Sequence, residues 1–150
     1  MTVNQLRDEL TAAELSSIPG AVFGEEETPA DVVEAWLSER LLQASDRVVA
    51  AINSCSRNTS IMTGLCKVPA ACVRMVLVLA RHAVISAIPG LSETLEGSTR
   101  SAEYNTATQD LTRLASCEFV PDYTLSEGES VTSAGNITLV LGEPKSDFLF

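Results

Sequence analysis

One stretch constrains the fold of this 150-residue chain more than any other: the apolar segment from Val68 to Ile88. Pro69 stands at its beginning, where proline is favoured as the first residue of a helix. Pro89 stands at its end, and proline cannot continue a helix. Because the segment is apolar nearly all round, it is typical of a helix that is covered on most sides. We therefore predict a buried helix at the centre of the fold.

Three polar side chains interrupt this segment and bear on where it lies. The segment is long enough to span a bilayer, but Arg74, Arg81 and His82 would be costly in lipid, which favours a buried helix in a folded domain. The two arginines fall on one narrow stripe, since seven residues make about two helical turns. We expect their charged groups to face a neighbouring subunit or the acidic helix predicted before this one. We interpret His82 as a hydrogen-bonded core or interface residue.

The N-terminal segment carries two helix-start signals. Thr2 and Gln5 have the spacing of a capping box, and so do Thr11 and Glu14. These signals predict that residues 3 to 17 form one bent helix or two short ones.

A second helix is predicted to run to about Asn53. Thr28 is its expected N-cap and Pro29 its first helical residue. Its apolar residues recur every three or four positions and so share one face. They are Val33, Leu37, Leu41, Ala44, Val48 and Ile52. Residues 54 to 67, rich in Ser, Asn, Thr and Gly, are predicted to be a long loop.

The last predicted helix begins near Ser98 and ends at about Cys117. Its expected inner face consists of Tyr104, Ala107, Leu111 and Leu114. Its expected outer face carries Glu103, Asp110 and Arg113. The chain is thus predicted to be mainly α: a compact four-helix bundle over residues 1–118, with a long loop and an extended C-terminal arm.

The arm, residues 119–150, is polar but contains one short run of β-forming residues, from Ile137 to Leu141. A lone strand needs a partner, which we expect in the 54–67 loop or in another subunit. The chain closes on apolar side chains, which also indicate a contact surface. The candidate assembly interface is Arg74, Arg81, Ile137, Leu139, Leu141, Phe148, Leu149 and Phe150.

Charge argues against nucleic-acid wrapping. Ten basic and twenty acidic residues give a formal net charge of -10, whereas DNA-binding surfaces neutralise phosphates with Lys and Arg. Both ends of the chain are acidic, and the middle is mildly basic.

The sequence predicts no catalytic, cofactor-binding or metal-binding residue. None of the four cysteines, Cys55, Cys66, Cys72 and Cys117, forms a pair with the two-residue gap of a zinc or redox motif. No secretory signal is visible at the start of the sequence, so we expect buried thiols in a reducing, cytoplasmic setting. No phosphate-binding or dinucleotide motif occurs either, and the chain is predicted not to be an enzyme.

The order of elements over residues 28 to 118 resembles a known family, the head-tail connector or adaptor proteins of tailed bacteriophages, in particular the Mu-like prophage connector group. In that family a long helix with a central Asp is followed by a loop, by a Val-Pro pair that opens an apolar helix, and by a further helix. The corresponding segments are Ala44-Ser45-Asp46, Val68-Pro69, Leu79-Ala80-Arg81-His82, Tyr104-Asn105-Thr106-Ala107 and Leu111-Thr112-Arg113-Leu114.

The resemblance implies a structural subunit of the phage neck, located in the virion and made in the cytoplasm of the bacterial host. Such subunits form a homo-oligomeric ring, usually of twelve, between the portal protein and the tail or tail-terminator protein. DNA would pass through the ring without specific binding, and acidic walls suit that passage. The alternative is an acidic helical binding protein, either a DNA mimic or a regulatory subunit.

Overall fold

The computed structural model describes residues 1–24, 28–57, 68–91, 98–119, 131–132 and 138–139. This part of the chain is mainly helical, as predicted. In chain order its elements are α1 (Val3–Asp8), α2 (Ala12–Ile18), η1 (Pro19–Phe23), α3 (Ala30–Ser54), η2 (Ala70–Cys72), α5 (Val73–Ser86), α6 (Thr99–Ala115), β1 (Val131–Thr132) and β2 (Thr138–Leu139).

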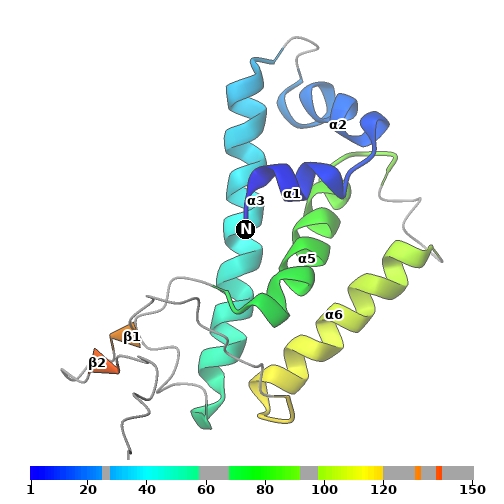
Figure 1. Cartoon of the computed structure of the whole chain (residues 1–150). Helices are drawn as coiled ribbons and strands as arrows, with labels where there is room; N and C mark the ends of the chain where they lie inside the picture. Colours follow the sequence, from blue (N-terminus) through cyan, green and yellow to red (C-terminus); the bar gives the residue numbers. More distant parts are fainter. Residues whose placement is uncertain (25–27, 58–67, 92–97, 120–130, 133–137, 140–150) are drawn as a thin grey trace, which may run out of the picture.

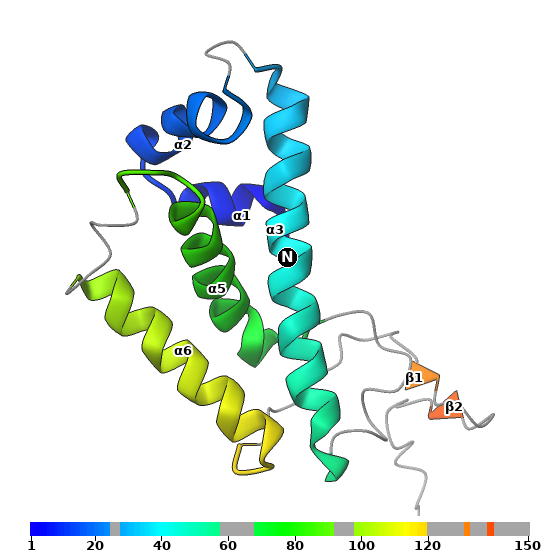
Figure 2. The ribbon, with the colours of Figure 1, turned by 180° about the vertical axis from the view of Figure 1, so that it is seen from behind.

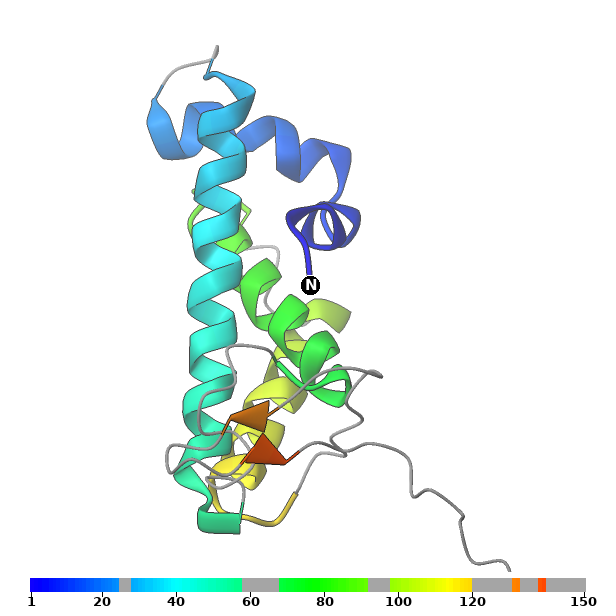
Figure 3. The same cartoon turned by 60° about the vertical axis from the view of Figure 1, so that its left-hand side comes forward.

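Helix α3 is the spine of the fold (Figure 1). Its 25 residues span about 37 Å at the usual helical rise. Both α5 and α6 pack against it and against each other, and the view from behind shows α5 between the other two (Figure 2). Helices α1 and α2 gather beside the N-terminal half of α3 (Figure 3), and α1 contacts both α3 and α5.

The N-terminal segment forms two short helices. Both predicted capping boxes are present: the side chains of Thr2 and Thr11 accept the amides of Gln5 and Glu14, whose own side chains accept the threonine amides in return. Helix α2 continues directly into η1, a π-helical turn, which ends at Gly24 in the left-handed conformation. Local capping chemistry therefore decides where these helices start.

Helix α3 begins one residue later than predicted. Its N-cap is Pro29 and not Thr28, because the carbonyl of Pro29 accepts the amides of Val32 and Val33 while Pro29 itself is extended. The predicted apolar face is confirmed. All six of its side chains are buried: Val33, Leu37, Leu41, Ala44, Val48 and Ile52.

The central helix is also confirmed. After Pro69, η2 makes one tight turn and α5 follows to Ser86. Nine of its fourteen residues are buried, so α5 is covered on most sides by α1, α3 and α6. No helix among the described residues is both long enough and apolar enough to cross a membrane.

The C-terminal segment differs from its prediction where the structure describes it. Residues of β2 pair antiparallel with β1, so that Val131 faces Leu139 and Thr132 faces Thr138. For these two residues the pairing strand comes from the same segment and not from the 54–67 loop, and a contact of the strand with another subunit stays a prediction. Ile137, Leu141 and the closing Phe148-Leu149-Phe150 lie outside the described residues.

Candidate functional site

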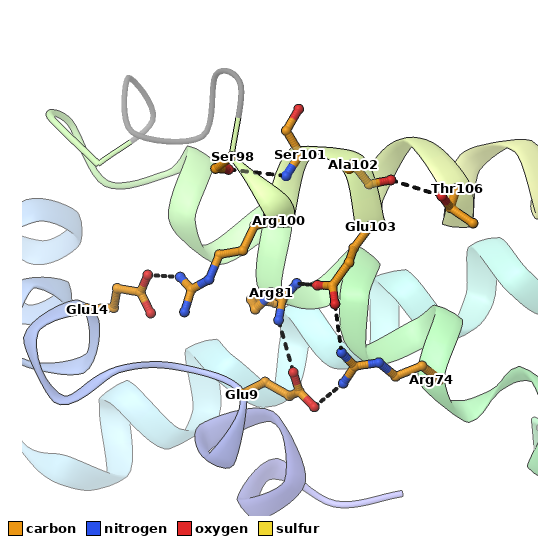
Figure 4. Close-up of polar contacts among 10 residues, drawn as sticks. All are labelled: Glu9, Glu14, Arg74, Arg81, Ser98, Arg100, Ser101, Ala102, Glu103 and Thr106. Carbon is orange, nitrogen blue, oxygen red and sulfur yellow. Dashed lines mark hydrogen bonds and ion pairs between the residues drawn. The ribbon is translucent and has the colours of Figure 1, made fainter.

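Four charged side chains close into a ring between α1, α5 and α6, which we call the charge ring: Glu9, Arg74, Arg81 and Glu103 (Figure 4). Each guanidinium binds both carboxylates, and each carboxylate binds both guanidiniums. Arg81 donates to Glu9 Oε2 at 3.0 Å, and Arg74 donates to Glu103 Oε1 at 3.3 Å. The remaining pairs, Arg74 with Glu9 and Arg81 with Glu103, complete the ring.

The elements position these groups in different ways. Glu9 is the C-cap residue of α1, and Glu103 lies one turn into α6. Arg74 and Arg81 are two turns apart on one side of α5, as their spacing predicted. The Arg81 side chain is only 7% exposed, whereas that of Arg74 is 56% exposed. The ring therefore has a buried half and a solvated half, and it ties three helices together.

Its electrostatics stabilise the ionised form of Glu103. The hydrogen bond from Arg81 holds the pKa of Glu103 below its usual value, and the charge of Arg74 adds to this effect. A buried guanidinium left without such acids would be strongly destabilising. The expectation that the arginines face the acidic helix before them is wrong, since the carboxylates come from α1 and α6. Glu103, assigned to an outer face, instead turns toward α5.

A second ion pair lies beside the ring. Arg100, in the first turn of α6, binds Glu14 of α2 (Figure 4). Glu14 is nearly buried, and burial alone would raise its pKa, but the amide of Thr11 and the charge of Arg100 hold the pKa below its usual value. The Glu14 carboxylate therefore caps α2 and also links α2 to α6 through its ion pair with Arg100.

His82 is a partly buried residue at the contact between helices. Its ring stacks on Tyr104 of α6, with centroids 3.6 Å apart and planes 14° apart. Its Nδ1 lies 3.3 Å from Ser86 Oγ, as the interpretation of a hydrogen-bonded histidine requires. Burial and the nearby charge of Arg47 lower the pKa of the imidazole.

Two grooves open on the surface of the described residues. The α5–α6 groove, of about 420 Å³, lies next to the charge ring; Arg74 and Glu103 form one edge, and Met75, Val78 and Phe119 supply apolar lining. The α3 groove, of about 340 Å³, lies where α3 meets the N-terminus and the start of α5. It is lined by Met1, Ser38, Leu41, Leu42, Ser45, Val68 and Val73.

The cysteines differ from their prediction. Cys55 and Cys117 form a disulfide, with Cα atoms 5.2 Å apart, so the expectation of buried thiols is wrong for this pair. The two residues follow the ends of α3 and α6, and tertiary packing brings these ends together across 62 positions of sequence. Cys72 is the buried thiol that was expected, and burial raises its pKa to about 11. Cys66 lies outside the described residues.

Of the candidate interface residues, the structure brings Arg74 and Arg81 together and places Leu139 in β2. An interface role for them stays a prediction. Within the described ranges, no three His, Cys, Asp or Glu side chains gather closely enough to hold a metal ion. Sequence reasoning missed both acids of the ring. The signal for them was the pair of arginines on an apolar helix, which requires carboxylates from other elements.

No protein-family model, curated protein or solved structure matches this chain. Membership of the phage connector family therefore stays a prediction.

Proposed function

We propose that this chain is a non-catalytic structural subunit of a phage neck, which forms a ring between the portal and the tail. In this proposal the helices of residues 1–118 are the compact bundle of the subunit, and residues 119–150 are its assembly arm. The ring extends the DNA channel and supports tail attachment.

The observation that carries the proposal is a pair of exposed apolar side chains, Leu42 and Met1, that line the α3 groove. Leu42, on its edge, is 60% exposed, and Met1 beside it is also exposed. Exposed apolar side chains that lie together on a surface are typical of a protein contact. Four of the residues that line the groove belong to α3, which corresponds to the long helix of the connector pattern.

Ion pairs between helices support the proposal of a subunit that keeps its shape on assembly. The charge ring joins α1 to α5 and α6, and the Glu14–Arg100 pair joins α2 to α6. These cross-links make the helices one unit, which can present its contact surfaces at fixed angles to identical neighbours. The net charge of -10 suits a channel wall from which DNA must slide freely.

Identification of a portal gene in the gene neighbourhood, followed by co-expression of its product with this chain and native mass measurement, tests the proposal. We expect a ring of subunits bound to the portal, which Leu42→Gln weakens and Val32→Gln does not. Val32 is the matched control because it is also exposed on α3 but does not line the groove. The absence of portal and capsid genes from the gene neighbourhood, or a portal that never retains the chain, would contradict the proposal.

A further inference from the structure

The turn that follows α6 contains Cys117, which forms the disulfide with Cys55. Ser116 is the C-cap of α6, and Cys117 follows it with φ 63, in the left-handed region that favours glycine. The amide of Glu118 donates to the carbonyl of Arg113 at 2.9 Å, and the amide of Cys117 donates to Leu114 at 3.3 Å. This is the Schellman pattern, with a cysteine where glycine is usual.

The turn directs the next residue onto the body of the protein. The amide of Phe119 also donates to the Arg113 carbonyl, at 3.1 Å. Its side chain packs against the core and lines the α5–α6 groove. The position of Phe119 thus depends on a backbone conformation that its neighbour Cys117 adopts only at a cost.

The disulfide anchors that conformation. Cys55, its other half, is the C-cap residue of α3 and is fully buried, so it is a fixed point. Cys117 is only partly buried. We propose that the Cys55–Cys117 disulfide is a redox-sensitive latch: when it is closed it holds the turn after α6 and keeps Phe119 on the α5–α6 groove, and when it is reduced it frees both.

The chemistry is thiol–disulfide exchange with a small dithiol as the reductant. A thiolate of the dithiol attacks Sγ of Cys117, because Sγ of Cys55 is shielded, and Cys55 leaves as a thiolate that takes up a proton. The second thiol of the reductant then displaces Cys117 and closes a cyclic disulfide. Two electrons and two protons pass to the protein, which ends with two thiols. Cys72 does not compete, because it is fully buried and remains a protonated thiol.

Three variants distinguish the effect of the disulfide bond from the effect of the left-handed turn at residue 117. Cys55→Ser removes the bond and leaves a side chain at 117. Cys117→Ser does the same from the other side. Cys117→Gly removes the bond but supplies the residue that the left-handed turn prefers.

Amide hydrogen exchange of Glu118 and Phe119, with and without dithiothreitol, tests the latch after peptide mapping has confirmed the Cys55–Cys117 bond. Reduction of the wild type should speed exchange at these two amides by roughly five- to thirtyfold, the factor by which a side chain disfavours the left-handed region. Amides of α5 should keep their protection. Both serine variants should match the reduced protein with or without dithiothreitol, and Cys117→Gly should keep its protection in both conditions.

Two results would overturn the latch. If the reduced protein kept full protection at Glu118 and Phe119, the turn would stand without the bond. If α5 lost protection together with the turn, the disulfide would be a global staple and not a local latch. A peptide map that linked Cys66 to either residue in the oxidised protein would also overturn it.

Discussion

Replacement of Arg81 by Met should be among the most destabilising single changes in the charge ring. The side chain is 7% exposed and lies between two carboxylates that are 23% and 36% exposed. Removing one partner of a buried ion pair usually costs about 3–5 kcal/mol, because the other partner is left uncompensated. Since Glu9 and Glu103 can recover part of their hydration, we expect a loss at the lower end, about 3 kcal/mol.

Two matched variants calibrate that figure. Arg74→Met removes a guanidinium from the same ring, but its side chain is 56% exposed, so the expected loss is about 0.2–1 kcal/mol. Arg113→Met breaks an exposed pair with Asp110 and should cost less than about 0.5 kcal/mol. Urea unfolding of the oxidised proteins at neutral pH, followed by far-UV circular dichroism, measures all three.

The pH dependence gives an independent check. The pKa of Glu103 is lowered in the folded state, so its ionic contribution is present above the usual carboxyl pKa and is lost as the pH falls through the lowered value. The gap in stability between wild type and Arg81→Met should therefore narrow in acid. If Arg81→Met cost no more than Arg74→Met at neutral pH, burial would not control the energy of the ring, and this reasoning would fail.

Four further substitutions test other features of the structure. Protonation of His82 is disfavoured in the folded state by burial and by the charge of Arg47, so the free energy of unfolding should decline as the pH falls below about 6.5. Urea unfolding measured down to mildly acidic pH should show a smaller decline for His82→Gln than for the wild type. Glu14→Gln should lower the free energy of unfolding by about 1–3 kcal/mol, because the Arg100 pair loses its charge while the nearly buried side chain still caps α2; an unchanged midpoint would contradict this. Gly24→Ala should lower the free energy of unfolding by about 1 kcal/mol or more, because Gly24 has a φ of 72. Gly20→Ala should leave the stability unchanged or raise it, since nothing lies within 4 Å of either added Cβ. Thermal melts of both variants measure the difference.

Structural features that depend on residues close together in the sequence could be predicted. The two capping boxes need residues only three positions apart, and both formed. The apolar face of α3 depends on the helical period alone, and all six of its predicted residues are buried. The central position of α5 follows from its composition, because a helix that is apolar on most sides must be covered.

Contacts between distant segments could not be assigned in the same way. Arg81 and Glu9 are 72 positions apart, and the sequence contains many other acids that could have met the arginine. Glu103 was assigned to the outer face of its helix because it is polar. The sequence of that helix contains no sign of the buried guanidinium of Arg81 on a neighbouring helix. The Cys55–Cys117 bond was missed for a similar reason: each cysteine follows a helix end, and only the packing of α3 beside α6 brings the two ends together.

Because the charge ring is closed, it also restricts which substitutions the protein can accept at these positions during evolution. Each carboxylate touches both guanidiniums, so exchanging the charges of one pair would set like charges against the other pair. A compensating change at a single position is therefore insufficient. The buried Arg81 and the two carboxylates that it contacts, Glu9 and Glu103, should therefore change together, whereas the more exposed Arg74 can be lost at little cost. In a set of homologous sequences, positions 9, 81 and 103 should covary, whereas Asp110 and Arg113 should vary independently of them.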